Sequence, residues 1–538
     1  MSGAADASPA RRRSRFLPLG RQRLLWVALL AGAALSLGIY HHLPWLNGPP
    51  QWKWPWVHER ILGRALAQSA ARFVLGAILL GGALLLVRRR LRRPAARRAA
   101  GLATLILWGL YAQWTLYAVA TPLGPLHSIR IVRDEIAFGY FGVAAALGDR
   151  LPPLPEFLRR YPQYMPALPP HASTKPPGPV VACRALRRLF ETAPRLTERI
   201  WRLAVRLDPR LELAETSGSR ADCAAAFTLA QLLMLAGLSA AWPLHALVRR
   251  SGGLPWREPA AWCAAWLWVH YPALAIFHPQ FDQLYPLLAL GALLCLARAI
   301  DPRQPAAGLP PALGLGLLLT LGLLLSFTML FLIPLVLIPV PLAAARRARS
   351  WRLRAIADQL GWRRPWGRRV GRALAAAGFI PVAVLFILRA SLGFDWIDTF
   401  LTALRHQHGT LLRGIERSYA TWLGWNLYDF LLFAGGTVAT FGLVFLGGAV
   451  RRGWRRPRRL LPIWFAFPFV LLLLDLSGLT PGETGRIWLF LAPGLVWAAA
   501  IELARRARAG WPTALFLVLL AQWIFLLVLR TRMHYIGW

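Results

Sequence analysis

Asp134 and Glu135 stand side by side in the segment IRIVRDEIAFGYFG and are the first candidates for chemistry in this chain. A carboxylate can take a proton from a hydroxyl nucleophile if it lies within hydrogen-bond reach of that hydroxyl. The pair follows a long apolar stretch, and charges beside a bilayer are costly unless water or a cation pairs with them. The structural alternative is helix capping, because acids also favour the first turn of a helix. The sequence leaves both interpretations open.

Two cations stand in motifs that suit an anionic ligand. Arg486 follows Glu483 in the segment PGETGRIWLF, and a planar guanidinium fork matches the geometry of a phosphate. Lys175 lies in HASTKPPGPV, four residues after His171. In the alternative interpretation, the long side chains extend towards lipid headgroups, and the Pro-Pro-Gly turn only starts the next helix.

Four further polar residues adjoin apolar segments. Asp282 and Tyr285 belong to FDQLY, and Asn426 and Asp429 belong to WNLYDF. Asp282 would also suit a helix N-cap. Because polar residues next to a bilayer are rare unless they serve a site, we interpret these four as candidate substrate-binding residues.

No residue pattern in the chain makes a convincing metal site. His406 and His408 form an HxH pair, but without a third ligand nearby we interpret them as exposed interfacial histidines. The cysteines are too far apart for a metal motif and are interpreted as small buried apolar residues: Cys183, Cys223, Cys263 and Cys295. We therefore expect no required cofactor and no metal ligand, and a divalent ion has no support.

These residues are carried by a strongly apolar chain. Its hydrophobic content is 57%, above the roughly 45–50% of soluble domains. The excess falls in uncharged blocks of about 20 residues, long enough to cross about 30 Å of hydrocarbon as helices and too uniform for barrel strands. The sequence predicts an all-α polytopic membrane protein with about 13 transmembrane helices. We place them at residues 24–45, 66–87, 101–121, 222–248, 259–277, 282–300, 308–326, 328–345, 373–390, 428–450, 460–476, 486–504 and 511–530. Whether 308–345 is one span or two stays open.

The basic residues assign the two sides of the membrane. The net charge of +40 comes mostly from arginine clusters in alternate gaps between the apolar blocks, which is typical of cytoplasmic loops rather than of nucleic-acid binding. These clusters are the amino terminus, 88–98, 249–253, 346–372, 451–459 and 505–508. The other gaps are predicted to be extracytoplasmic, and all ten candidate residues from Asp134 to Arg486 lie on or beside them. These extracytoplasmic gaps are 46–65, 122–221, 278–281, 391–427, 477–485 and the carboxyl end.

The large loop 122–221 is predicted to lie outside the cytoplasm. Its amphipathic stretch 181–207 suggests interfacial helices on the outer leaflet. Its proline-rich middle, 151–180, is predicted to be ordered but irregular. We divide the chain into an amino-terminal part with two additional transmembrane helices (1–100), a transmembrane core that includes the loop (101–505), and a last helix with an extracytoplasmic end (506–538).

Three of the motifs resemble the GT-C superfamily of membrane glycosyltransferases, especially the protein O-mannosyltransferase and lipid A aminoarabinose transferase branches (glycosyltransferase family 39-like). RDEIAFGYF resembles the Asp-Glu motif of the first external loop in that family. HASTKPPGPV resembles the segment that ends this loop, and GETGRIWLFLAP resembles a late motif. The resemblance extends over about residues 101–505. Family members often carry His directly before the Pro-Pro pair, where this chain has Lys175.

This resemblance implies a specific reaction at the extracytoplasmic face. A sugar would move, with inversion, from a polyprenyl-phosphate donor to a hydroxyl of a cell-envelope glycan, lipid or protein. Asp134 would be the general base, with Glu135 supporting it or orienting the acceptor. Arg486, Lys175 and Glu483 would hold the donor phosphate and lipid. The substrate-binding residues would be His171, Asp282, Tyr285, Asn426 and Asp429.

Further expectations concern location and partners. The resemblance implies a multi-pass protein of the bacterial cytoplasmic membrane whose partners are the bilayer, the donor and the acceptor, with no nucleic acid. Two alternatives remain: a transporter or flippase for polyprenyl lipid or another solute, and a non-catalytic relative that binds lipid. The sugar, the acceptor and the oligomeric state cannot be inferred from the sequence.

Overall fold

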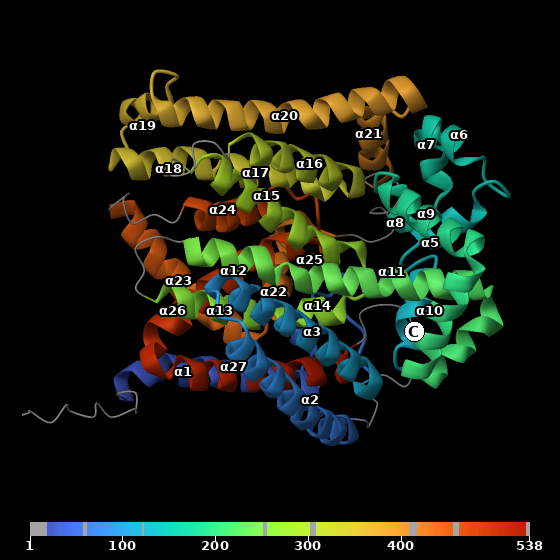
Figure 1. The fold of residues 1–538 in the computed structure, drawn as a ribbon, viewed down its shortest axis with the longest axis horizontal. Helices are drawn as coiled ribbons and strands as arrows, with labels where there is room; N and C mark the ends of the chain where they lie inside the picture. Colours follow the sequence, from blue (N-terminus) through green and yellow to red (C-terminus); the bar gives the residue numbers. More distant parts are fainter. Residues whose placement is uncertain are drawn as a thin grey trace, which may run out of the picture.

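A computed structural model of the chain describes residues 19–57, 62–120, 123–250, 256–301, 308–407, 417–455 and 462–533. Over these ranges the chain is helical, and its β structure is limited to two isolated bridges. Figure 1 shows long helices that run roughly side by side, with the short helices of the large loop gathered at one end. The all-α prediction is confirmed.

Eight helices among the described residues are long and apolar enough to cross a membrane, or nine if one bent pair counts as a span. The prediction of a polytopic membrane protein is therefore confirmed. The long segments are α1 (Leu19–Tyr40), α2 (Leu62–Arg90), α3 (Pro94–Ala120), α11 (Arg220–Ser239) with α12 (Ala241–Arg250), α15 (Tyr285–Ala299), α17 (Leu332–Leu337) with α18 (Pro339–Ala348), α20 (Pro365–Leu392), and α26 (Ala492–Ala507) with α27 (Trp511–Arg532). Two shorter apolar helices are α16 (Leu309–Leu325) and α24 (Pro462–Leu476). The short helices α13 (Arg257–Val269) and α14 (Pro272–Ile276) lie between α12 and α15 in the chain.

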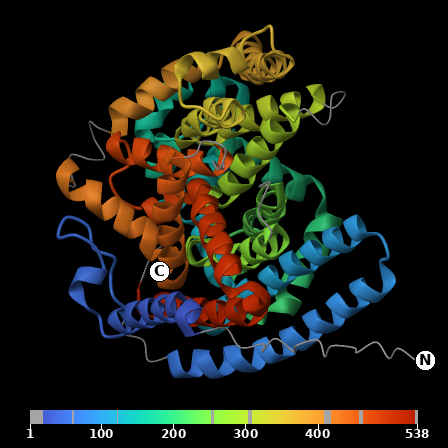
Figure 2. The ribbon, with the colours of Figure 1, turned by 90° about the vertical axis from the view of Figure 1, so that its left-hand side faces the viewer.

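Two helices at opposite edges of the bundle expose apolar faces. Figure 2 shows α1 and α2 at the edge away from α20. In the most apolar 18-residue stretch of each helix, only 6% of the residues are buried in α2 and 17% in α20. Side chains such as Ile78 and Phe379 are 67% and 71% exposed. Lipid solvates such faces and water does not, so these helices border the bilayer.

Helix breaks correct one predicted span and settle another. The predicted span 428–450 is not one continuous helix, because α22 (Tyr419–Leu432) and α23 (Gly436–Arg455) meet at 116°. Gly435 makes this bend with φ +80°, and a Cβ there would lie 2.1 Å from Oε1 of Gln522. The segment 308–345 contains two helical segments, since Ser326 is extended after the end of α16. A helix overlaps each of the other predicted spans.

The proline-rich middle of the large loop is more helical than predicted. Short helices α6 (Leu154–Arg159), α7 (Tyr161–Tyr164) and α8 (Pro170–Ser173) replace the expected irregular chain. Proline in the first turn explains them, because that position needs no N–H and proline already has a helical φ.

The amphipathic stretch forms two helices, as predicted. They are α9 (Gly178–Thr192) and α10 (Pro194–Leu207). α9 packs on α11 and on α5 (Tyr140–Ala146), and α10 exposes Leu203 and Leu207. The position of α10 on the outer leaflet stays a prediction. Two further helices, α19 (Leu353–Leu360) and α21 (Trp396–His406), flank α20.

The orientation of the bundle predicts which introduced cysteines can be labelled. Asp149 lies exposed in the large loop, and Leu353 is 82% exposed in α19 on the arginine-rich side. In intact cells a membrane-impermeant maleimide should label Asp149→Cys and should label Leu353→Cys only after permeabilisation. The unmodified chain is the control, because its cysteines are buried or partly buried. Labelling of Leu353→Cys without permeabilisation would show that the orientation is the reverse of the predicted one.

Candidate functional site

Asp134 begins a tight turn between two short helices of the large loop. It follows the end of α4 (Leu126–Arg133), and its Oδ1 accepts hydrogen bonds from the amides of Ile136 (2.9 Å) and Ala137 (2.5 Å). Both Asp134 and Glu135 are exposed. The carboxylate thus orders this turn and does not cap α5, which begins only at Tyr140. Its Oδ2 has no protein hydrogen bond among the described residues, and the residue is exposed.

The Asp134 turn packs directly on the segment that carries Asp282. Gln280 donates a hydrogen bond from Nε2 to the carbonyl of Ala137 (2.6 Å). The rings of Phe138 and Phe281 stack with centroids 5.6 Å apart. Since Asp282 is the next residue in the 3-10 turn Phe281–Leu284, the candidate base and the charged residues share one region.

Asp282 lies between two cations that come from distant segments. Its Oδ1 is 3.8 Å from Nζ of Lys175, and its Oδ2 is 3.7 Å from Nε of Arg486. Nη2 of Arg486 is 2.5 Å from Oε2 of Glu483. We call Lys175, Asp282, Glu483 and Arg486 the charge cluster. The side chains of Lys175, Asp282 and Arg486 are 15% or less exposed.

The charge cluster has hydrogen-bonding capacity that the protein does not use. Among the described residues, Oδ1 of Asp282 and Nε of Arg486 are buried and make no hydrogen bond. Lys175 donates to Oγ of Ser326 (3.1 Å), and its Nζ lies 5.7 Å from the ring centroid of Tyr285. Buried charges normally satisfy their donors and acceptors, so the loose pairing indicates a place for a polar ligand.

Backbone contacts bring Lys175 to this position. Ser326 interrupts the helices of residues 308–348, and its hydroxyl therefore faces Lys175. Gly178, at the start of α9, permits the approach, because a Cβ there would lie 2.1 Å from the carbonyl oxygen of Leu324. The Pro-Pro-Gly sequence after Lys175 thus serves close packing as well as the start of a helix.

Burial and neighbouring charges set the protonation of the loop residues at the site. Burial lowers the pKa of His171 well below its usual value, and the cations Arg486 and Lys175 lower it further. Burial also lowers the pKa of Lys175, while Asp282 opposes that shift. Burial raises the pKa of Tyr140, whose ring lies 6.5 Å from that of His171. His171 is therefore neutral near pH 7 and can accept a hydrogen bond.

Asn426 and Asp429 hold the turn that carries Glu483 and Arg486. Oδ1 of Asn426 accepts from the amide of Gly482 (2.9 Å), and Oδ2 of Asp429 accepts from the amide of Gly485 (3.1 Å). Glu483 has φ +55°, a conformation that costs a non-glycine residue free energy and that these contacts support. Their contacts are with protein groups, and a direct substrate role for either stays a prediction.

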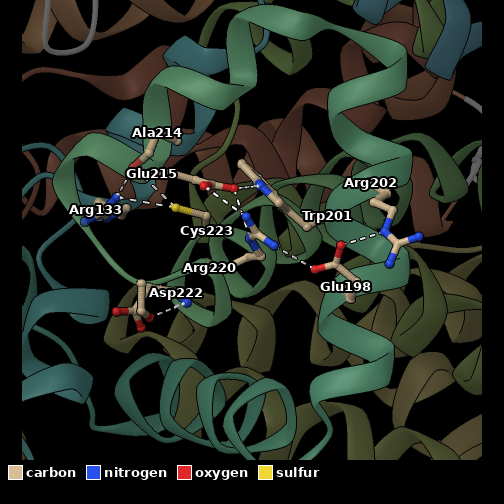
Figure 3. A network of polar contacts seen from close by, with 10 residues as sticks. Arg133, Glu198, Trp201, Arg202, Ala214, Glu215, Arg220, Asp222 and Cys223 are labelled. Atoms are coloured by element: carbon tan, nitrogen blue, oxygen red, sulfur yellow. Dashed lines mark hydrogen bonds and ion pairs between the residues drawn. The ribbon is translucent and has the colours of Figure 1, made fainter.

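A polar network fixes the large loop to the membrane helices (Figure 3). Arg133, the last residue of α4, donates from Nη1 to the carbonyl of Ala214 (3.2 Å). Arg220 pairs with Glu215 (3.1 Å) and with Glu198 of α10 (2.9 Å). The network anchors the helix that ends at Asp134, so it positions the candidate base without touching it.

An apolar cavity of about 420 Å³ lies among the membrane helices next to the site. Phe430 of α22 and Leu491 line one end, and the ring of Phe430 is 6.2 Å from that of Trp488, two residues after Arg486. α22, α23, α24 and α26 supply most of the wall. The other lining residues are Leu427, Leu431, Gly442, Leu443, Leu446, Val450, Trp464, Phe465, Phe467, Pro468, Phe469, Leu471, Leu472, Gly494, Leu495 and Ala498.

The described residues contain no group of three or more His, Cys, Asp or Glu side chains that could hold a metal ion. His406 lies at the end of α21, whereas His408 is outside the described residues. The four cysteines are unpaired, and Cys183, Cys223 and Cys263 are buried.

Sequence reasoning missed several residues beside the site. Trp54 donates from Nε1 to Oδ1 of Asp429 (3.2 Å), and the guanidinium of Arg417 lies 4.3 Å from the ring of Trp52 and 5.3 Å from that of Trp422. The tryptophan repeat in WKWPW was a visible signal, because three tryptophans in five residues are unusual in an external loop.

No protein-family model and no curated protein matches the chain. Among solved structures, the chain is similar to the crystal structure of the Archaeoglobus fulgidus oligosaccharyltransferase in complex with zinc and sulfate. The two are 18% identical, with a TM-score of 0.32, and the match covers 60% of this chain and 43% of that one. The chain thus matches less than half the length of that structure.

The lowered pKa of His171 predicts a pH dependence of stability. In the unfolded chain His171 binds a proton below about pH 6.5, whereas in the folded chain its lowered pKa keeps it neutral. The free energy of unfolding therefore decreases as the pH falls through this range. Between pH 7.5 and 5.5 this loss should be on the order of 1 kcal/mol. Thermal unfolding of the purified chain should show a smaller loss for His171→Asn, which stays neutral. An equal loss in both proteins would refute the prediction.

Proposed function

We propose that this chain is a glycosyltransferase that moves a sugar from a polyprenyl-phosphate donor to an acceptor hydroxyl at the extracytoplasmic membrane face. The observation that carries the proposal is the charge cluster, whose unused hydrogen-bonding groups lie next to an apolar cavity. A ligand that matches both must join an anionic group to a long hydrocarbon chain. A polyprenyl phosphate has this chemistry.

The donor phosphate would bind between Lys175 and Arg486. The guanidinium offers a fork of donors that suits phosphate oxygens, and Lys175 adds a compact charge with donors to spare. Asp282 and Glu483 hold these cations in place before the ligand arrives. Such preorganised cations stabilise the negative charge that grows on the phosphate as it leaves.

The hydrocarbon tail of the donor would enter the apolar cavity. Its walls are almost entirely aliphatic and aromatic, so it offers no partner for a polar ligand. Because the tail comes from the bilayer and not from water, van der Waals packing against these walls would favour its binding there. Phe430 lines the cavity, and its ring lies 6.2 Å from that of Trp488, two residues after Arg486, so a tail in the cavity would lie near a phosphate at Arg486.

Asp134 would act as the general base. Its Oδ1 is occupied by two backbone amides, which fix the carboxylate and leave Oδ2 for the acceptor hydroxyl. The hydroxyl proton moves to Asp134 as the acceptor oxygen bonds to the anomeric carbon. The bond from that carbon to the phosphate oxygen breaks, and its electron pair stays on the lipid phosphate. One displacement with one base inverts the anomeric centre.

The remaining candidates would contact the sugar and the acceptor. Glu135, exposed beside Asp134, would orient the acceptor, and neutral His171 and Tyr285 would bind sugar hydroxyls. The acceptor would be a cell-envelope glycan, lipid or protein, and the membrane would be the bacterial cytoplasmic membrane. Neither a cofactor nor a metal enters the proposed step.

One observation favours a transporter as the second candidate. The break of 116° between α22 and α23 lies close to Asp429, and broken helices line the substrate sites of many transporters. A transporter would move a labelled lipid or solute across proteoliposomes without forming a glycosidic bond. Glycosyl transfer in detergent, where there are no sides to cross, would exclude transport as the sole function.

The proposal predicts which variants lose transfer. Purified protein would be given a radiolabelled polyprenyl-phosphate sugar and membrane acceptors. Asp134→Asn should lower the rate about 10²- to 10⁴-fold, because it removes the base, and Arg486→Gln about 10²- to 10³-fold. Glu135→Gln, on the neighbouring exposed residue, is the matched control and should lose far less.

Two results would contradict the proposal. Unchanged transfer by Asp134→Asn would remove the base assignment. No transfer from any polyprenyl-phosphate sugar by a correctly folded chain would reject the glycosyltransferase. Thermal unfolding of each variant distinguishes lost chemistry from lost folding.

A further inference from the structure

The connection between α1 and α2 packs against the site. We call residues 44–57 the strap. Trp54 of the strap donates to Asp429, and the hydroxyl of Tyr428 donates to the carbonyl of Leu46 (2.9 Å). Oε1 of Gln51 accepts from the amide of Ser418 (3.1 Å). The strap is thus fastened to α22, the helix that also holds the Glu483 turn.

The strap and α22 enclose a small pocket with aromatic walls. We call it the aromatic pocket. Its lining residues are Gly48, Pro49, Trp52, Trp54, Trp422, Trp425, Tyr428, Asp429 and Glu483. The enclosed space is about 10 Å³, which is room for one water-sized group.

Three donors at the aromatic pocket have no partner among the described residues. They are Nε1 of Trp52, Nε1 of Trp422 and Nε of Arg417, and all three atoms are buried. The Arg417 guanidinium covers the rings of both tryptophans. Buried indole N–H groups usually find an acceptor, so these three donors beside one pocket can bind a polar ligand.

The walls suit a sugar better than other small ligands. Indole faces pack against the apolar face of a sugar ring, while indole N–H groups donate hydrogen bonds to sugar hydroxyls and carboxylates accept hydrogen bonds from them. The pocket offers both kinds of partner, with Asp429 and Glu483 as the carboxylates. A purely apolar ligand would leave the three donors unpaired, and a second phosphate would face the two carboxylates.

We propose that the aromatic pocket is the subsite for the donor's sugar, which packs against the half-buried Trp52 and places one hydroxyl in the enclosed space. This inference rests on the proposed function. Glu483 links the two sites, because it lines the pocket and pairs with Arg486 at 2.5 Å. The pocket is thus one side chain away from Arg486, and the sugar of a donor whose phosphate binds there would enter it. The helices that precede the core thus contribute to substrate recognition.

Equilibrium binding of two radiolabelled probes to the full chain in nanodiscs tests the inference. The probes are decaprenyl phosphate and decaprenyl phosphate that carries a single glucose or arabinose. Trp422→Phe, which keeps an aromatic ring and removes one N–H, and Trp52→Ala should each weaken the binding of a sugar-bearing probe about tenfold. Binding of the bare phosphate should not change.

Two variants serve as controls. Trp45→Phe changes a strap tryptophan that is 61% exposed and outside the pocket, and it should alter neither probe. Arg486→Gln should weaken both probes, because it removes the proposed phosphate ligand.

The outcomes separate the two proposals. If Trp52→Ala and Trp422→Phe affect both probes equally, or neither, while Arg486→Gln weakens both, the sugar subsite is refuted and the proposed function stands. If neither probe binds, or Arg486→Gln changes nothing, the proposed function fails and this inference with it. If the tryptophan variants weaken only the binding of a free glycan acceptor, the pocket does not hold the donor's sugar.

Discussion

Asp282 is a buried carboxylate between two cations, and the geometry of the site depends on this pairing. Lys175 comes from the large loop and Arg486 from the segment before α26, so one acid joins segments that lie 107 residues before it and 204 residues after it. Removing one member would leave the others buried and uncompensated, which typically costs about 3–5 kcal/mol. The two pairs of Asp282, at 3.8 and 3.7 Å, are too long for hydrogen bonds, so its carboxylate holds the cations and leaves room for a ligand.

The residues of the charge cluster lie where helices break or end. Ser326 interrupts a pair of helices and binds Lys175, and Gly435 bends the chain between α22 and α23. Glu483 takes a positive φ, and Asn426 and Asp429 support the turn around it by accepting hydrogen bonds from the amides of Gly482 and Gly485. Regular helices satisfy their own backbone and fill the membrane. Irregular backbone at the edge of the membrane leaves polar groups free to bind a substrate, provided that other parts of the protein satisfy the remaining backbone hydrogen bonds.

The fold class could be predicted because hydrocarbon thickness fixes the length of an apolar helix, and every long apolar block became helical. The break within the span 428–450 could not be predicted, because the apolar pattern continues through Gly435 and Gly436. The close approach of Gln522 to Gly435 at the bend is a tertiary contact that the sequence does not show. Candidates such as Lys175, Asp282 and Arg486 were found by residue type, but their convergence depends on tertiary distances. The strap was missed because its tryptophans carry no charge and act through contacts with α22. The role of Asp134 stays a prediction.

The central claim is that the charge cluster binds a lipid phosphate, and a cryo-EM structure of the full chain with decaprenyl phosphate tests it most directly. The account predicts phosphate density within about 3.2 Å of both Nζ of Lys175 and the guanidinium of Arg486, with the hydrocarbon chain in the cavity lined by Phe430 and Leu491. A phosphate bound elsewhere, with the pairs of Asp282 unchanged and the cavity empty, would contradict it.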